Sequence, residues 1–258
     1  MLFRSTGDEE GPSINGTKKV LEWLRAKGHA LDHALGGEPT AVADAGDTIK
    51  IGRRGSMNVR LRVSGTQGHT AYPQRANNPV PTMARIVTQL AALELDKGSA
   101  HFEPSTLAFT TIDTGNTATN VIPASLRAGF NIRFNDLHTP ESLAAKIRTV
   151  TDLVARESGC AIETEIDVSG VSFVTQPDAY IATLQDAVRA VRGREAELST
   201  GGGTSDARFI KDDCPVVELG LAGATMHKVD ECVPVADVEQ LTAIYEKVLE
   251  LYFQRFAR

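Results

Sequence analysis

Alternation of apolar and polar residues is clearest in the middle of the chain. Within residues 57–63, four apolar side chains fall on one face and three polar ones on the other: Met57, Val59, Leu61 and Val63 against Asn58, Arg60 and Arg62. A period of two residues predicts a strand that buries one face and exposes the other. Residues 126–134 repeat the alternation, and residues 105–113 and 161–168 also indicate strands.

Two stretches with helical spacing lie between these strands. In residues 80–95 the apolar positions recur every three or four residues, which is typical of a helix with one buried face. A second helix is expected to follow Thr139, which can cap it with Pro140 in the first turn, and to end at Gly159. The order of elements over residues 56–168 is then β-α-β-β-α-β, which is the ferredoxin-like arrangement.

The segments on either side of this region indicate a second domain of α/β type. Asn15 can cap a helix that starts near it. Helices are expected at residues 15–27, 178–192 and 237–256, and strands at residues 48–52, 196–200 and 215–220. We therefore expect a ferredoxin-like lid domain of residues 55–169 inserted into an α/β domain made of residues 1–54 and 170–258.

Composition and charge narrow the choice of partners. The 258 residues are 41% hydrophobic and 23% charged, as in an ordinary globular protein, and the net charge of −6 argues against nucleic acid. No apolar run reaches the roughly 18–20 residues needed to span a bilayer, so no membrane partner is expected. The three cysteines are widely spaced, form no zinc or disulfide framework, and favour a cytoplasmic location.

Most of the candidates for chemistry lie in predicted loops beside strand ends, whereas Arg133 lies in a predicted strand, and each by itself has an ordinary structural explanation. They are Glu9 and Glu10 in GDEEG, Glu38 in GGEPT, His69 in QGHTAYP, Asn120 in TNVIP, Arg133, the GGGTSD loop and His227 in MHKVDE. Together, carboxylates and histidine at such places favour a zinc or similar site. Of two adjacent glutamates, one can bind a metal while its neighbour acts as the general base. The GGGTSD loop lacks the lysine of a phosphate-binding loop.

Seven motifs, read in order, resemble the succinyl-diaminopimelate desuccinylase family of the di-zinc aminoacylase and carboxypeptidase superfamily. They are GDEEGPSINGTKKVLEWL, GEPT, GRRGS, QGHTAYPQRANNP, TNVIPA, GGGTSDARFI and MHKVDECV, and they run over essentially the whole chain. The resemblance implies a metallopeptidase-like α/β catalytic domain interrupted by a βαββαβ lid through which two subunits form a homodimer. It also implies hydrolysis of N-succinyl-L,L-2,6-diaminopimelate to succinate and L,L-diaminopimelate, a step of lysine and cell-wall precursor biosynthesis.

The same resemblance implies roles for individual residues. Glu9 resembles the general base and acid, Glu10 and His227 resemble ligands of one zinc, and Glu38 resembles a ligand of the other, with cobalt as a possible substitute metal. His69 resembles the lid histidine that reaches into the partner's active site. The positions that match contacts to the polyanionic substrate are Arg53, Arg54, Ser56, Asn120, Arg133, Gly203 and Thr204. Arginine forks suit the carboxylates of such a substrate.

The chain departs from the family at its beginning. The family's His-x-Asp motif and its bridging aspartate lie upstream of the GDEEG loop, whereas Met1 stands only a few residues before that loop. One zinc would keep Glu10 and His227 and the other only Glu38, although tight sites use three or four protein ligands. We therefore expect an N-terminally truncated chain, with an incomplete set of ligands for two zinc ions, that is inactive or nearly so alone.

Two alternatives stay open. The first is a related deacylase such as an acetylornithine deacetylase, against which GGGTSDARF and MHKVDE favour the desuccinylase. The second is a non-catalytic dimerisation protein in which only the βαββαβ domain still functions. The presence of Glu9, Glu10, Glu38, His69 and His227 argues against such a remnant, which would be free to lose them.

Overall fold

The structure, a computed structural model, describes residues 3–256 and divides into two compact units. Unit 1 is formed by Met1–Arg53 together with Phe173–Arg258, and unit 2 by Arg54–Ser172. Each unit has its own cluster of buried hydrophobic residues. The α/β class expected from the sequence is confirmed, whereas the assignment of one unit as catalytic domain and the other as lid stays a prediction.

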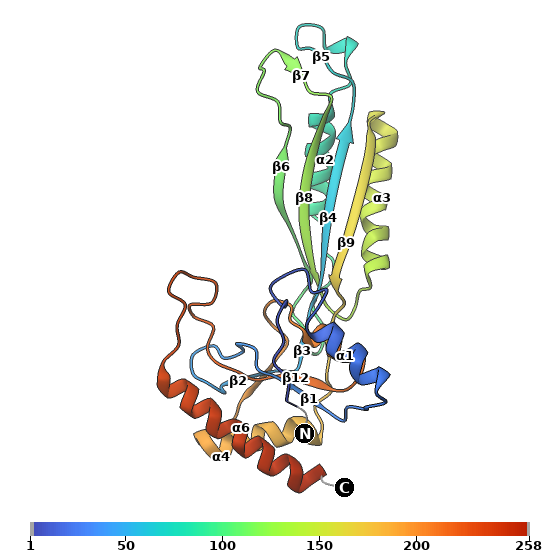
Figure 1. Ribbon diagram of the computed structural model, residues 1–258. Coiled ribbons are helices and arrows are strands. Elements are labelled where there is room, and N and C mark those ends of the chain that lie inside the picture. The colour runs from blue at the N-terminus through green and yellow to red at the C-terminus, as the bar shows by residue number, and fades with distance from the viewer. Residues whose placement is uncertain (1–2, 257–258) are drawn as a thin grey trace. The chain divides into compact units, whose positions relative to one another are not determined.

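Unit 2 is built on a four-stranded antiparallel sheet with the strand order β6-β8-β4-β9 and with two helices on one face (Figure 1). The central strand β4 pairs along its length with β8 on one side and β9 on the other. The predicted order β-α-β-β-α-β is thereby confirmed. Its elements are β4 (Gly55–Ser64), α2 (Pro79–Ala91), β6 (Thr106–Asp113), β8 (Ser125–Phe134), α3 (Pro140–Ser158) and β9 (Ala161–Gly170).

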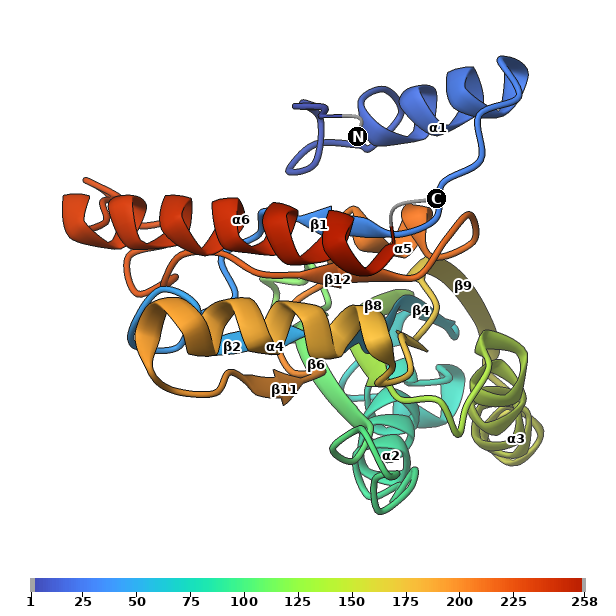
Figure 2. The same ribbon diagram turned by 90° about the horizontal axis from the view of Figure 1, so that it is seen from below.

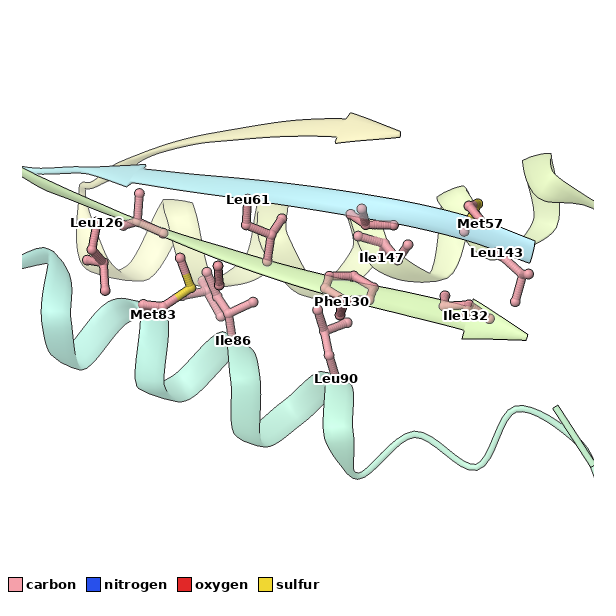
Figure 3. Packing of buried hydrophobic residues seen from close by; sticks show 14 of the residues in the cluster. Met57, Leu61, Met83, Ile86, Leu90, Leu126, Phe130, Ile132, Leu143 and Ile147 are labelled. Atoms are coloured by element: carbon pink, nitrogen blue, oxygen red, sulfur yellow. The ribbon is translucent and has the colours of Figure 1, made fainter. Parts of the chain in front are cut away.

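The apolar face of β4 forms the centre of the core of unit 2. Met57, Val59, Leu61 and Val63 are each at most 1% exposed, as their alternation in the sequence predicts. Figure 3 shows side chains of the sheet meeting side chains of both helices: Leu61, Leu126, Phe130 and Ile132 against Met83, Ile86 and Leu90 of α2 and Leu143 and Ile147 of α3. Because the helices cover only one face of the sheet, the other face of these strands is polar.

Helix α3 begins and ends where the sequence predicts. The hydroxyl of Thr139 accepts a hydrogen bond from the backbone N–H of Ser142 at 3.2 Å, and Pro140 is the first helical residue. Gly159 ends the helix with a φ of 66°, a conformation that glycine adopts without strain. Two short strands of unit 2, β5 (Gly68–His69) and β7 (Val121–Ile122), pair next to the 3₁₀ turn Pro73–Arg75.

Unit 1 contains a mixed four-stranded sheet of short strands in the order β1-β12-β2-β11 and a two-stranded ladder of β3 with β10. The parallel pair β1 and β12 joins segments from the two ends of the chain. The strands are β1 (Ala34–Gly36), β2 (Thr48–Lys50), β3 (Gly52–Arg53), β10 (Phe173–Val174), β11 (Glu197–Ser199) and β12 (Val216–Glu218), and the helices are α1 (Thr17–Ala26), α4 (Ala179–Arg192), α5 (Ala207–Ile210) and α6 (Val235–Phe256).

Helices α4 and α6 lie side by side against this sheet (Figure 2). Leu184 and Val188 of α4 and Ile244 of α6 are fully buried, and they share a cluster with Ile49 of β2 and Val217 of β12. Among residues 3–256, no helix is both long enough and apolar enough to cross a membrane.

Two local predictions about the helices are wrong. Asn15 does not cap α1: the residue before the helix is Gly16, and the backbone N–H of Asn15 donates instead to Asp8 Oδ2 at 2.9 Å. Helix α2 ends at Ala91, although the apolar pattern continues to residue 95. Leu95 is only 9% exposed, because a non-helical segment also packs on the core there, and periodicity alone cannot distinguish the two cases.

Candidate functional site

The loop that carries three consecutive carboxylates is organised by the first of them. Asp8 has a φ of 67°, and its Oδ2 accepts hydrogen bonds from the backbone N–H groups of Ile14 at 2.7 Å and Asn15 at 2.9 Å. These bonds, that from Asn15 first, lower the pKa of Asp8 below its usual value. Asp8 therefore holds the loop in shape, and Glu9 and Glu10 remain available for chemistry.

Glu10 and His227 face each other. The distance from Glu10 Oε1 to His227 Nε2 is 3.6 Å, and both side chains are largely exposed. Two ligands of a tetrahedral zinc ion, with bonds of about 2.0–2.1 Å, lie about 3.3 Å apart. This separation fits two of the four corners of a zinc site. The backbone of His227 has a φ of 61°, and its N–H donates a hydrogen bond to Glu231 Oε2 at 3.3 Å.

Glu38 lies in a strongly acidic environment. Burial, together with the neighbouring carboxylates of Glu218 and Glu9, raises the pKa of its carboxyl to about 7, although the guanidinium of Arg53 opposes this rise. A carboxyl group that protonates near neutral pH, surrounded by other carboxylates, is a place where a dication would offset the repulsion.

The position of Glu38 is fixed by the segment around Thr40. The hydroxyl of Thr40 donates to the carbonyl of Thr48 at 3.0 Å and accepts from the N–H of Gly220 at 2.9 Å, so it joins the loop to β2 and to the segment that follows β12. A Cβ atom at Gly220 would stand 2.0 Å from the carbonyl oxygen of Glu38. Only glycine allows this approach of the two backbones.

Glu9 belongs to the same acidic environment. Burial raises the pKa of Glu9, and the carboxylates of Glu10 and Asp206 raise it further, whereas Arg208 opposes them. Arg208 in turn donates from Nη2 to Ser13 Oγ at 2.9 Å. Asp206 and Arg208 are not among the predicted site residues, although both stand in the motif GGGTSDARFI.

The residues present fit a metal site in part. Within residues 3–256, no three His, Cys, Asp or Glu side chains are arranged so that they could hold one ion together. The pair of Glu10 and His227 has suitable donor atoms at a suitable distance, and Glu38 supplies a carboxylate that negative charge surrounds. The described residues therefore supply two ligands for one metal ion, Glu10 and His227, and one carboxylate, Glu38, for another.

Arg53 is engaged inside unit 1. It is only 6% exposed, and its Nε donates to Glu218 Oε2 at 2.6 Å while its Nη1 donates to the carbonyl of Gly203 at 3.0 Å. Gly203 itself is exposed and Thr204 is half-buried, both in the loop between β11 and α5. The two predicted loop contacts therefore lie directly beside the predicted arginine.

Arg54 and Arg133 lie close together in unit 2. Both are half-buried, and burial together with the positive charge of Arg54 lowers the pKa of Arg133. No carboxylate among the described residues forms an ion pair with either guanidinium, and Arg54 Nε is buried without a hydrogen-bond partner. Ser56 is also buried here and accepts a hydrogen bond from Asn131 Nδ2 at 3.1 Å. Two adjacent cationic groups without an acid partner suit a bound carboxylate.

His69 and Asn120 lie together at the paired strands β5 and β7. Both side chains are exposed, and the backbone N–H of Thr70 donates to the carbonyl of Asn120 at 3.0 Å. The ring nitrogen Nδ1 of His69 accepts from the N–H of Ala71 at 3.0 Å, so in the neutral imidazole the proton is on Nε2. The predicted site residues thus divide between the units, with Glu9, Glu10, Glu38, Arg53, Gly203, Thr204 and His227 in unit 1 and Arg54, Ser56, His69, Asn120 and Arg133 in unit 2.

Comparison with known proteins identifies the class of fold. Residues 51–158 match the peptidase dimerisation domain of the M20 family. A crystal structure of a tripeptidase from Staphylococcus aureus superposes with a TM-score of 0.71 at 22% identity, covering 86% of this chain and 57% of that one. Residues 51–158 are therefore similar to a dimerisation domain of M20 peptidases, and the chain shares the fold of the tripeptidase.

Two curated relatives define the similarity more closely. Succinyl-diaminopimelate desuccinylase from Rhodospirillum centenum is 59% identical over 248 residues, and that from Parvibaculum lavamentivorans is 56% identical over 248 residues. The chain is a homologue of the succinyl-diaminopimelate desuccinylases, as its motifs predict. Each match covers 96% of this chain but 63% of the relative, so the chain spans less than two-thirds of their length.

Proposed function

We propose that this chain forms part of a metal-dependent amide hydrolase of the cytoplasm. The reaction converts N-succinyl-L,L-2,6-diaminopimelate and water into succinate and L,L-diaminopimelate, in lysine and cell-wall precursor biosynthesis. The observation that carries the proposal is the acidic group of Glu9, Glu10 and Glu38 with His227 beside it. This group lies in a chain that is 59% identical to the succinyl-diaminopimelate desuccinylase of Rhodospirillum centenum.

Glu10 and His227 would hold one zinc ion and Glu38 the other. When bound, zinc or cobalt supplies a Lewis acid that polarises the amide carbonyl. The three residues by themselves leave each ion with fewer than the three protein ligands that a catalytic zinc usually has. Metal binding and activity of this chain alone are therefore expected to be weak.

Glu9 would hold and move the proton of the reaction. Its raised pKa and partial burial suit a general base that accepts a proton from the attacking water and passes it to the leaving amine. His69, whose Nε2 carries the proton when Nδ1 accepts a hydrogen bond, would donate to the oxyanion of the tetrahedral intermediate in the partner's active site.

Arg54 and Arg133 would bind a carboxylate of the substrate. Their guanidinium groups lie close together and lack an acid partner among the described residues, so a polyanionic ligand supplies what the protein does not. Ser56 and Asn120 in unit 2, and Arg53, Gly203 and Thr204 in unit 1, complete the proposed recognition set. Unit 2 would also form the homodimer, as the dimerisation domain that it matches suggests.

A chimera provides the test of this function. The segment of the Rhodospirillum centenum relative that precedes its matched region would be fused to this chain, and turnover of N-succinyl-L,L-diaminopimelate and N-acetyl-L-ornithine would be compared. We expect the succinylated substrate to be strongly preferred and Glu9→Gln to abolish turnover. Preference for acetylornithine would favour the related deacylase, and no turnover of either substrate would favour the non-catalytic dimerisation protein.

A further inference from the structure

Glu218, the last residue of β12, is a buried carboxylate with no role assigned so far. It is 2% exposed, and each of its two carboxylate oxygens accepts a hydrogen bond. Oε2 accepts from Arg53 Nε at 2.6 Å, and Oε1 accepts from the hydroxyl of Ser205, which is fully buried. Glu218 therefore joins the end of β3 to the glycine-rich loop 201–206.

Arg53 extends this connection into the middle of the loop. Its Nη1 donates to the carbonyl of Gly203 at 3.0 Å. Gly202 has a φ of 98°, and a Cβ atom there would stand 3.0 Å from the same Nη1. The loop backbone thus follows the surface of the guanidinium, and the orientation of the guanidinium depends on Glu218.

The beginning of the loop is fixed independently. Ser199 Oγ accepts from Lys50 Nζ at 2.9 Å and from the backbone N–H of Gly201 at 3.2 Å. The contacts of Ser205 and of the Gly203 carbonyl then fix its second half. The exposed Gly203 and the half-buried Thr204 lie between these two anchors.

We propose that Glu218 is a positioning residue that shapes the glycine-rich loop through Arg53 and Ser205. Arg53, besides its place in the proposed recognition set, then acts as an internal support of the Gly203 carbonyl. A negative charge is needed at Glu218, because an amide in its place would leave the buried guanidinium uncompensated. The role of Glu218 in shaping the loop does not depend on the proposed function. That the loop then contacts the substrate does rest on it.

Backbone hydrogen–deuterium exchange tests the structural half of the proposal in the chain as it exists. Glu218→Gln and Ser205→Ala would be compared with Glu239→Gln, which removes an exposed glutamate of α6 as a matched control. We expect exchange within residues 201–206 to be about tenfold faster in both test variants, with α4 and α6 unchanged. Unchanged exchange in the loop would overturn the proposal, and so would an acceleration spread over all of unit 1. Ser205→Ala keeps the test decisive if Glu218→Gln fails to fold.

Calorimetric titration with N-succinyl-L,L-diaminopimelate tests the functional half. We expect Ser205→Ala to weaken binding about tenfold and Glu239→Gln to leave it unchanged. Equal binding by Ser205→Ala, in spite of faster exchange in the loop, would overturn the positioning role. Absence of binding by the unmodified chain would count against the proposed function, while the exchange experiment would still decide whether Glu218 shapes the loop.

Discussion

Asp96 shows how hydrogen bonds control a buried carboxylate in unit 2. Its Oδ1 accepts from the N–H of Gly98 and from Asn135 Nδ2, both at 2.7 Å, and its Oδ2 lies 3.1 Å from His138 Nε2. Burial raises the pKa of Asp96, but the bonds from Ser105, Gly98 and Asn135 outweigh it and hold the pKa at about 2. The ionised form is therefore the form that stabilises this region.

A dependence of stability on pH follows from Asp96. Since its pKa is lower in the folded chain than its usual 3.8, its contribution is complete above about pH 4 and is lost as the pH falls toward 2. The loss amounts to about 2 kcal/mol of unfolding free energy. Urea unfolding of the chain and of Asp96→Asn should show a gap that narrows by that amount between pH 5 and pH 2. A gap independent of pH would contradict the assignment, and the exposed Asp136→Asn serves as control.

Zinc content tests the donor pair of Glu10 and His227. After purification with zinc, we expect fewer than two zinc ions per chain by elemental analysis, because the pair and Glu38 leave each ion short of ligands. His227→Ala should lower the zinc affinity at least about tenfold, whereas His29→Ala, which removes another exposed histidine of unit 1, should not change it. Two tightly held zinc ions per chain would contradict the expectation.

At the scale of elements, the sequence predicted those whose pattern extends over many residues. The ten-residue strand β4 and the helix α3, with Thr139 and Gly159 at its ends, were predictable because periodicity and caps agree. The strands β1, β5, β7 and β10 have two or three residues each, which is too short for alternation to show. They form because distant backbone segments meet, and local sequence carries no sign of that.

The same limit applies to the candidate site. Motifs indicated Glu10, Glu38 and His227, but nothing local distinguishes Glu218 in the strand VVELG from an ordinary buried position. Its importance depends on Arg53, which is 165 residues away in the chain. Likewise, the proximity of Arg54 to Arg133 follows from the pairing of β4 with β8.

The helix caps allow a comparison of two residues that look equivalent in the sequence. Thr139→Ala should reduce the unfolding free energy by about 1 kcal/mol, because the hydroxyl of Thr139 caps the N–H of Ser142. Asn15→Ala should change it by less than about 0.5 kcal/mol, since the side chain of Asn15 caps nothing at α1. Chemical denaturation of both variants measures the difference. Equal losses would show that Asn15 caps the helix in solution.

At the scale of the whole molecule, the sheet of unit 2 leaves β6 as an edge strand that pairs only with β8 among the described residues. Edge strands are commonly paired or protected. We expect the chain to be a homodimer, with a mass by light scattering of twice that of the chain at micromolar concentration. A monomer at all concentrations would contradict the dimer and would leave His69 without a partner site.

The insertion of unit 2 between the two halves of unit 1 sets an order of events during translation. Residues 34–36 of β1 pair with residues 216–218 of β12, so unit 1 cannot close its sheet until nearly the whole chain has left the ribosome. Unit 2 is complete at residue 172 and is free to fold first. At about 5–20 residues per second, β1 waits about 10–35 s for its partner. Throughout that interval β1 and β2 lack the strands β12 and β11 with which they pair, so Ile49 of β2 is not yet buried and a chaperone can bind this segment.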